Sequence, residues 1–432
     1  MKKVAFITLG CKVNTYETEG MKRLFEKSGY EVVEPDNCAD VYVINTCTVT
    51  HLSDRKSRQM IRRARRLNPD AVIAAVGCYA QVAPEEVSKI EGVNLVIGNN
   101  RKSEIVELVE EVSRDEKKIE VLPGRELKEY EELWAGSYTG HTRAFLKIQD
   151  GCDQFCSYCI IPFARGRIRS RSMESIMDEA RKLVDNGFKE IVLTGIHLTS
   201  YGKDTGKGTL LDVIRELDKM ERLSRIRLGS LEPLYMTEEM IREMSGIEKL
   251  CPHFHLSLQS GCDETLARMN RKYTTTEYRG IVEKIRRYFE DVAITTDIMT
   301  GFPGETDAEF RKTCEFVQSI GFSQAHIFQY SVRKGTKAAA MKDQVPPEVK
   351  EERSKILTAI CNNSMRAFRE NQIGRVKDVL FEEKVDGYYA GHTDNYIPVR
   401  VLSDENLSGE LLSVRLVKNE HDFMIGQLYN EK

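Results

Sequence analysis

The sequence predicts an α/β protein with three parts: an N-terminal doubly wound parallel sheet, a central partial βα barrel of six strand–helix units, and a small C-terminal β-barrel. Three observations support this fold. Apolar runs alternate with helix-like segments along the first part of the chain, a second alternating series follows, and the last part changes to short alternating strands. Continuous apolar strands that alternate with helices are typical of parallel sheets covered on both faces.

The N-terminal sheet is predicted from four apolar runs, which are Val4–Leu9, Val41–Ile44, Ala71–Val76 and Leu95–Ile97. Helix-like segments follow them at residues 17–27, 53–67, 85–90 and 103–112. We expect this domain to span residues 1–115. The next stretch, 116–141, loses the alternation and carries mixed charge, Pro123 and Gly124, which is typical of a linker.

The second series predicts a barrel domain over residues 142–371. Its six strands are Phe145–Gln149, Ile191–Thr194, Ile226–Gly229, Phe254–Leu258, Ile294–Met299 and Ala325–Tyr330. The remainder, residues 372–432, is predicted to form a small antiparallel barrel. Its strands are Val376–Phe381, Tyr389–Gly391, Ile397–Val401 and Leu411–Val417.

The composition indicates which classes of protein this chain can belong to. The formal net charge of −3 combines 64 basic with 67 acidic residues, so total charge gives no indication of a nucleic-acid partner. The sequence has no apolar run of about 20 residues that would predict a membrane span, and we expect a cytoplasmic protein without a membrane partner. Eleven cysteines in such a protein favour metal binding or catalysis over disulfides.

A cysteine triplet, Cys152-x3-Cys156-x2-Cys159, follows the first predicted barrel strand. Barrel active sites are built from the loops that follow the strands, so this position favours chemistry. Three thiolates hold three corners of a 4Fe–4S cluster and leave one iron open for a non-protein ligand. The alternatives are three structural thiols and a zinc site, but structural zinc sites normally have a fourth protein ligand.

This triplet, with Tyr158 before its last cysteine, resembles the signature of the radical S-adenosylmethionine (SAM) superfamily. The resemblance implies that SAM binds the open iron and is cleaved to a 5′-deoxyadenosyl radical. It also suggests SAM contacts from Tyr158 and from residues near the ends of barrel strands, namely Gly195, Ser230, Glu232, Gln259 and Asp297. Any one of these residues has the alternative role of a polar side chain that caps the barrel.

A second triplet emerges when the predicted strand ends of the N-terminal sheet are aligned. Cys11, Cys47 and Cys78 each lie just beyond one of three parallel strands. The carboxyl ends of parallel strands lie at one edge of a sheet, where ligands bind, so the three thiols are expected to converge. The alternative is that each is a small buried hydrophobic residue.

The segments around these cysteines, Leu9-Gly10-Cys11-Lys12-Val13-Asn14, Asn45-Thr46-Cys47-Thr48 and Gly77-Cys78-Tyr79, resemble the N-terminal domain of the methylthiotransferases. That resemblance extends over nearly the whole chain, including a C-terminal domain that resembles the TRAM RNA-binding barrel. It implies a second 4Fe–4S cluster on Cys11, Cys47 and Cys78 that carries the sulfur to be transferred.

Within the family, Gly10-Cys11-Lys12-Val13-Asn14 and Gly151-Cys152-Asp153-Gln154-Phe155-Cys156 most resemble the MtaB branch. The resemblance implies addition of a methylthio group to carbon 2 of N6-threonylcarbamoyladenosine at tRNA position 37. The sister branches act on isopentenyladenosine in tRNA or on a ribosomal-protein aspartate. A non-enzyme alternative is an iron–sulfur RNA-binding module.

Two clusters of arginines are candidate RNA contacts. Arg62 and Arg63 belong to a basic helix near the second cysteine of the N-terminal sheet, whose alternative is a solvated amphipathic face. Four more follow the barrel triplet closely, namely Arg165, Arg167, Arg169 and Arg171. The C-terminal domain has more acidic than basic residues, which does not favour phosphate neutralisation there and leaves a purely structural barrel as the alternative.

The resemblance also implies partners for the reaction. They are the anticodon loop of tRNA, an electron donor of the flavodoxin or ferredoxin type, and a sulfur donor whose identity it leaves open. No catalytic residue beyond the cluster ligands is expected, because cluster and SAM supply the chemistry and the protein supplies geometry.

Overall fold

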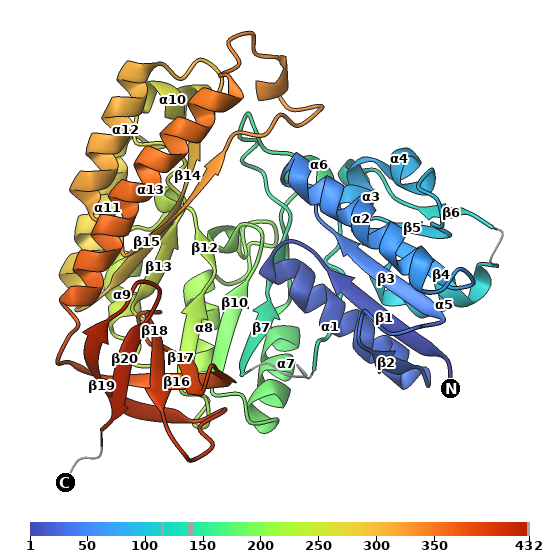
Figure 1. Cartoon of the computed structure of the whole chain (residues 1–432), viewed down its shortest axis with the longest axis horizontal. Coiled ribbons are helices and arrows are strands. Elements are labelled where there is room, and N and C mark those ends of the chain that lie inside the picture. Colours follow the sequence, from blue (N-terminus) through green and yellow to red (C-terminus); the bar gives the residue numbers. More distant parts are fainter. Residues whose placement is uncertain (114–115, 137–141, 430–432) are drawn as a thin grey trace.

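A computed structural model describes residues 1–113, 116–136 and 142–429 (Figure 1). The three predicted parts are present: a parallel sheet with helices, an open βα barrel beside it, and a small barrel at the C-terminal end. The α/β fold predicted from the sequence is confirmed. The predicted boundaries at residues 115 and 141 fall outside the described residues.

The N-terminal sheet has six parallel strands in the order β2-β1-β3-β4-β5-β6. They are β1 (Lys3–Thr8), β2 (Glu31–Val33), β3 (Val41–Thr46), β4 (Val72–Gly77), β5 (Leu95–Ile97) and β6 (Lys118–Glu120). Its helices are α1 (Lys12–Lys27), α2 (His51–Leu67), α3 (Cys78–Val82), α4 (Pro84–Ser88), η1 (Lys102–Glu104) and α5 (Ile105–Glu111). Two strands, β2 and β6, were not predicted because each has only three residues and neither forms a continuous apolar run. β6 pairs with β5, so the sheet continues into the stretch predicted as linker, which also contains η2 (Gly124–Glu126).

The barrel strands form two parallel sheets, ordered β11-β10-β7 and β12-β13-β14-β15. They are β7 (Arg143–Lys147), β10 (Glu190–Thr194), β11 (Arg225–Leu228), β12 (Ser230–Leu231), β13 (His253–Leu256), β14 (Ala293–Thr300) and β15 (Gln324–Gln329). β11 and β12 are separated only by Gly229, so they act as one bent strand and complete the six predicted units. Among the described residues, β7 and β15 do not pair with each other, which leaves the barrel open on that side.

Helices cover the outside of the barrel (Figure 1). They are α7 (Met173–Asp185), α8 (Leu210–Asp218), α9 (Glu238–Ser245), α10 (Asp263–Arg268), α11 (Thr275–Tyr288), α12 (Asp307–Ile320) and α13 (Pro347–Glu370). The short helix α6 (Ile161–Arg165) instead packs against α3 and η2 of the N-terminal part. Shorter elements are the hairpin of β8 (Gln149–Asp150) and β9 (Arg169–Ser170), with the turns η3 (Leu198–Ser200), η4 (Pro233–Tyr235) and η5 (Ala338–Ala340). No helix in the described part of the chain is long and apolar enough to cross a membrane.

The C-terminal domain is a closed barrel in the order β16-β17-β18-β20-β19. Its strands are β16 (Val376–Val385), β17 (Tyr388–Thr393), β18 (Pro398–Leu402), β19 (Leu411–Asn419) and β20 (Met424–Leu428), of which the last was not predicted. It packs at the N-terminal end of the barrel strands through main-chain oxygens. Arg225 donates to the carbonyl of Asp378 at 2.6 Å, and Arg227 donates to the carbonyl of Asp394 at 2.8 Å.

A buried ionic network joins the N-terminal sheet to the barrel. The carboxylate of Glu17 on α1 accepts hydrogen bonds from Lys102 at 2.6 Å, Lys147 at 2.8 Å and Arg165 at 2.8 Å. Asp150 at the start of the triplet loop accepts from the same Lys147 at 2.6 Å and also binds Arg165. None of the five residues is more than 5% exposed. Glu17 is therefore the carboxylate through which three cations from separate elements are held together.

We predict that Glu17→Gln lowers the free energy of unfolding by about 3–5 kcal/mol, because it leaves buried cations without their counter-charge. Urea unfolding at neutral pH measures the loss. Burial raises the pKa of Glu17, but Arg165, Lys102 and Lys147 outweigh it and hold the pKa well below its usual range. The stabilisation is thus present above about pH 4.3, where the unfolded carboxyl ionises, and is lost as the pH falls below that value. The exposed Glu26 of the same helix, changed to Gln, is the matched control, and equal unfolding curves for the two variants would contradict the assignment.

Candidate functional site

The first cysteine triplet lies in the loop between β8 and α6, at the mouth of the barrel. The loop is fixed by main-chain hydrogen bonds to other mouth loops: the amide of Ser157 donates to Met269 at 3.0 Å, and its carbonyl accepts from Ala338 at 2.8 Å. The amide of Cys152 donates to the carbonyl of Gly166 at 3.0 Å. The thiols are therefore carried by a loop whose path is set by several barrel segments.

The three thiols of this loop share one electrostatic environment. Burial is the main cause that raises the pKa of Cys152 and of Cys159 to about 12, and the neighbouring Cys156 contributes to both increases. Arg271 donates to the sulfur of Cys156 at 3.3 Å and also holds the carboxylate of Glu232, at 2.7 and 2.8 Å. Burial favours the neutral thiols here, so iron binding has to displace their protons.

The second triplet lies at one edge of the N-terminal sheet, where the sequence predicted it. Cys11 caps the start of α1 after β1, Cys47 directly follows β3, and Cys78 begins α3 after β4. Burial raises the pKa of Cys11 and, to about 11, that of Cys47, and both thiols also interact with Cys78. Gly10 allows this approach, because a Cβ atom there would lie 2.9 Å from the Cβ of Cys47.

Cys78 has two neighbours that donate to its sulfur. The Nε of Arg165 lies 3.3 Å away and the amide nitrogen of Asn99 lies 3.6 Å away. Arg165 thus links the sulfur of Cys78 to the buried network of Glu17 and Asp150. Among the described residues, no three cysteine, histidine or acidic side chains converge as closely as a single metal ion requires. The fit of each triplet to a metal cluster rests on its three neighbouring thiols.

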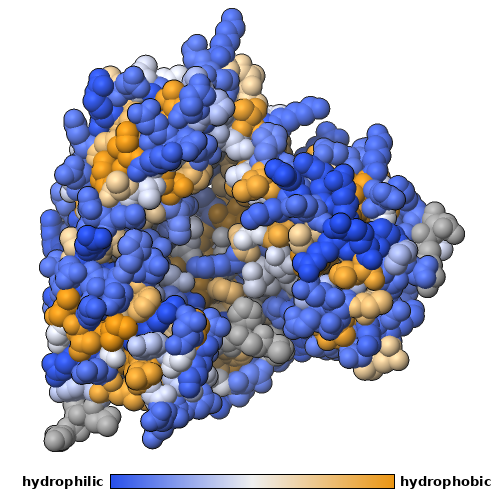
Figure 2. Space-filling model, in the orientation of Figure 1, coloured by the Kyte–Doolittle hydropathy of each residue, from blue (hydrophilic) through white to orange (hydrophobic). Residues whose placement is uncertain are grey.

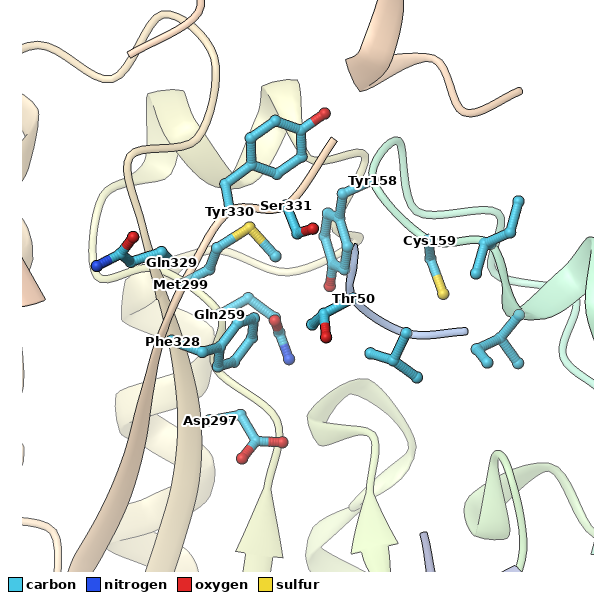
Figure 3. Close-up of a pocket in the computed structure, with 13 residues that line it drawn as sticks. Thr50, Tyr158, Cys159, Gln259, Asp297, Met299, Phe328, Gln329, Tyr330 and Ser331 are labelled. Carbon is cyan, nitrogen blue, oxygen red and sulfur yellow. The ribbon is translucent and has the colours of Figure 1, made fainter. Parts of the chain in front are cut away.

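A cavity of about 200 Å³ opens beside the first triplet, and both domains line it. Figure 3 shows Cys159 and Tyr158 on one side, Gln259 and Asp297 on the other, and Thr50 between them. Thr50 lies three residues beyond Cys47, so the loop of the second triplet forms part of the wall. The same loop is tied to the barrel, because the amide of His51 donates to the hydroxyl of Ser331 at 3.2 Å.

A second tie joins the domains at the mouth. Arg333, which follows β15, donates to Asp54 at 2.7 Å and to Thr48 at 2.6 Å, and all three side chains are buried. The N-terminal sheet therefore reaches over the barrel mouth. The loop that follows Cys47 therefore lies at the same mouth as the first triplet.

Three of the six residues expected to contact SAM line this cavity: Tyr158, Gln259 and Asp297. The backbone of Gln259 has a positive φ of 71°, and its side-chain oxygen is buried without a partner among the described residues. Burial opposes the charge of Asp297, but the hydrogen bond from His255 and the nearby His326 hold its pKa below the usual value. A buried acceptor without a partner and an ionised carboxylate fit the hydroxyl and amino groups of a nucleoside ligand.

The other three expected contacts lie outside the residues that line the cavity. Burial raises the pKa of Glu232 more than Arg271 lowers it. Ser230 is exposed. Gly195 packs against Gln149, where a Cβ atom would lie 2.9 Å from the side-chain oxygen. That oxygen accepts from the amide of His197, and the side-chain nitrogen donates to the carbonyl of Gly151 at 2.7 Å, so Gly195 supports the triplet loop from behind.

The expectation that all four arginines after the barrel triplet face RNA is wrong for three of them. Arg165, Arg169 and Arg171 are at most 4% exposed. Arg171 pairs with Glu179, and Arg169 donates to the main-chain oxygen of Arg165 at 2.7 Å. The physical reason is that two other helices pack against this segment and supply carboxylate partners, Glu17 of α1 for Arg165 and Glu179 of α7 for Arg171, which the local sequence does not indicate.

Arg167 remains exposed beside the mouth, and its guanidinium lies 5.0 Å from the ring of Phe155. Arg62 and Arg63 are also exposed on α2. Figure 2 shows a strongly hydrophilic band over this helix, next to the hollow between the two domains. These three arginines keep the surface position that RNA contact requires.

Sequence reasoning missed several residues of the site. Arg271, Gln149 and Thr50 were not singled out, although each contacts or supports a cysteine loop. Arg271 lies in a basic loop far from the triplet in sequence, and only the barrel brings it to Cys156. The position of Thr50 three residues after the second cysteine of its triplet is the one signal that the sequence offered.

Family comparisons cover both cysteine domains. A sequence model of uncharacterized protein family UPF0004 matches residues 3–98, and one of the radical SAM superfamily matches residues 146–317. The chain is 41% identical to threonylcarbamoyladenosine tRNA methylthiotransferase MtaB of Bacillus subtilis, over 99% of this chain and 96% of that protein. It is 42% identical to the Aquifex aeolicus protein of the same name, over 92% and 96%.

A related enzyme and a solved structure are also similar. The tRNA-2-methylthio-N(6)-dimethylallyladenosine synthase of Acetivibrio thermocellus is 36% identical over 95% of this chain and 87% of that protein. The structure of the radical SAM methyltransferase TsrM from Kitasatospora setae, with cobalamin and a [4Fe-4S] cluster bound, superposes with a TM-score of 0.57. It has 16% identity and covers 78% of this chain and 77% of that one, so it supports the fold alone.

We predict that Gly151→Ala prevents iron binding by the first triplet. Gly151 has a φ of +74°, and a Cβ atom there would collide with the main-chain oxygen of Arg167, which displaces the adjacent Cys152. Iron per chain after anaerobic reconstitution is the measurement. Gly187→Ala is the matched control, because Gly187 has a φ of +90° and no atom of the described residues lies within 4 Å of the added atom. This control should cost about 1–2 kcal/mol in stability and retain its iron. Full iron in both variants would refute the role of Gly151.

Proposed function

The chain belongs to the family of radical SAM methylthiotransferases of the MtaB type, and we propose from this membership how its own residues serve the reaction. It is a radical SAM enzyme that uses SAM and a 4Fe–4S cluster to add a methylthio group to N6-threonylcarbamoyladenosine in tRNA. The main support for the proposed site is one cavity that both cysteine loops line. Cys159 of the first triplet lies on one side of it, and Thr50, from the loop that follows Cys47, lies on another.

In this proposal Cys152, Cys156 and Cys159 hold the 4Fe–4S cluster that binds SAM. Cys11, Cys47 and Cys78 hold a second one. When bound, the first cluster supplies the electron that cleaves SAM, and the second presents the sulfur that is transferred. Both triplets consist of three thiols without a fourth cysteine beside them, which suits clusters with one open iron.

The residues of the chain fix the reactants in this scheme. We assign to Gln259 and Asp297 hydrogen bonds with SAM, because both line the cavity and Gln259 has an unpartnered oxygen there. Tyr158 closes the cavity on the cluster side. Arg271 places a permanent positive charge 3.3 Å from the sulfur of Cys156, which compensates the negative charge that this sulfur would carry as a cluster ligand. Positioning in an enclosed site is the main contribution a protein makes to cofactor chemistry of this kind.

The tRNA is proposed to approach along α2 and the mouth of the barrel. Arg62, Arg63 and Arg167 are exposed there and suit phosphate contacts. An adenosine beside the anticodon lies in an exposed loop, so it can enter the cavity at a small cost in unstacking. An electron donor of the flavodoxin or ferredoxin type and a sulfur donor complete the reaction, and the tRNA substrate implies a cytoplasmic enzyme.

The substrate is tested by nucleoside mass spectrometry of tRNA from a strain that lacks this gene. We predict that the wild-type chain restores methylthio-threonylcarbamoyladenosine and that Cys152→Ala does not. An increase in methylthio-dimethylallyladenosine instead would assign the chain to the sister activity. Unchanged tRNA together with a modified ribosomal-protein aspartate would refute a tRNA substrate.

The second cluster is tested separately by metal analysis. Alanine at Cys11, Cys47 and Cys78 together should remove about half of roughly eight irons per chain, since each 4Fe–4S cluster contributes four. The variant should still cleave SAM to deoxyadenosine under reducing, oxygen-free conditions, because the first triplet is intact. The matched control is alanine at Cys38, an exposed cysteine outside both triplets. Full iron retention in the triple variant would overturn the second site.

A further inference from the structure

Lys12 occupies a special position between the two domains. It is the first residue of α1 and directly follows Cys11, so its backbone belongs to the loop of the second triplet. Its side chain is within electrostatic range of Tyr396, Arg143, Arg227 and Glu190. Three of these residues belong to barrel strands and Tyr396 to the C-terminal domain. Lys12 therefore extends from the N-terminal sheet toward the open side of the barrel.

This side of the molecule is hollow. Figure 2 shows a depression between the N-terminal domain and the barrel. β7 and β15 leave the barrel open there, and α1 contacts β7. The Lys12 residue is exposed although elements of all three domains surround its ammonium group. The barrel interior connects this group with the cavity: His253 on β13 is within electrostatic range of Lys12, and His255 on the same strand lies 3.2 Å from Asp297 in the cavity wall.

Lys12 differs from the other cations around the hollow in forming no ion pair with a described residue, although Glu190 lies within its electrostatic range. Arg143 pairs with Glu382 at 3.1 Å, and Arg227 pairs with Glu190 at 2.7 Å. Within the part of the chain that the structure describes, no carboxylate lies within ion-pair distance of Lys12. A cation among other cations, partly removed from water and unpaired, favours an anionic ligand.

The threonylcarbamoyl nucleoside and the dimethylallyl nucleoside of the sister enzymes differ in negative charge. A threonylcarbamoyl group on N6 ends in a carboxylate, which is ionised at neutral pH, whereas a dimethylallyl group is a hydrocarbon. A site that presents a charged donor rejects a ligand without the matching acceptor, because the donor is then left partly desolvated and unpaired. Carbon 2 and the N6 substituent lie on the same edge of the adenine ring, on either side of N1, so an adenine that presents carbon 2 to the second triplet also turns its substituent toward the domain that carries Cys11.

We propose that the ammonium group of Lys12 binds the carboxylate of the threonylcarbamoyl group and thereby selects this nucleoside over the dimethylallyl one. The inference rests on the proposed function, since it takes the modified adenosine as substrate. It assigns to one loop two tasks, cluster binding by Cys11 and substrate selection by Lys12. Lys12 is a specificity residue in this scheme and takes no part in breaking or forming bonds.

The test measures how tightly the reconstituted enzyme binds two anticodon stem-loops, one with threonylcarbamoyladenosine and one with unmodified adenosine. Fluorescence anisotropy in the absence of oxygen gives the two dissociation constants. Lys12→Gln should weaken binding of the threonylcarbamoyl stem-loop by about 10-fold to 100-fold, the range for a lost hydrogen bond between charged groups. Binding of the unmodified stem-loop should be unchanged. Lys12→Arg, which keeps the charge, should retain most of the preference.

Lys27→Gln is the matched control, because Lys27 is an exposed lysine at the other end of the same helix. Iron content and thermal unfolding of each variant exclude a general loss of structure. If the Lys12→Gln variant loses iron, the test changes the RNA instead of the protein. A stem-loop in which a neutral amide replaces the threonyl carboxylate should bind the wild-type enzyme as weakly as the unmodified stem-loop does.

The outcomes separate the inference from the proposed function. An equal loss for both stem-loops would make Lys12 a general phosphate contact and overturn the inference, as would equal binding of the acid and the amide by the wild-type enzyme. If the wild-type enzyme neither binds nor modifies the threonylcarbamoyl stem-loop, the proposed function itself fails. Wild-type modification of tRNA with an unaffected Lys12→Gln variant refutes the role of Lys12 alone.

Discussion

The carboxylate of Glu17 is the constraint on which the arrangement of the site depends. Ion pairs of this kind are costly to desolvate, so they persist only where their geometry is closely satisfied. Here Glu17 gathers cations from η1, β7 and the end of α6, and one of them, Arg165, also donates to the sulfur of Cys78 at 3.3 Å. The orientation of the sheet relative to the barrel and the position of one triplet thus have a common physical origin.

The mouth of the barrel is the second place where the domains are held together. Arg333, Asp54 and Thr48 form a buried cluster there, and Thr50 continues from it into the cavity wall. A transfer reaction between two cofactors needs both to face one enclosed volume, since reacting groups must come within about 3–3.5 Å. Two independent ties, one buried behind the triplets and one at the mouth, supply the rigidity that this requirement implies.

Most of the fold was predictable because long apolar strands alternate with amphipathic helices, and the positions of the cysteines followed from where strands end. The three-residue strands β2 and β6 are too short to show a continuous apolar run. The burial of Arg165, Arg169 and Arg171 could not be predicted either, because their partners Glu17 and Glu179 come from other helices. Arg271 and Gln149 were missed for the same reason: their importance depends on contacts between distant segments, which a single sequence does not contain.

The way the C-terminal barrel is attached bears on how such a domain can diverge. Arg225 and Arg227 donate hydrogen bonds to the main-chain oxygens of Asp378 and Asp394 in this domain. A peptide carbonyl is present whatever side chain the residue carries. Substitutions on the surface of this domain therefore leave those bonds in place. These two bonds tolerate a change in the net charge of the domain, whereas side-chain ion pairs across the same interface, such as that of Arg143 with Glu382, do not.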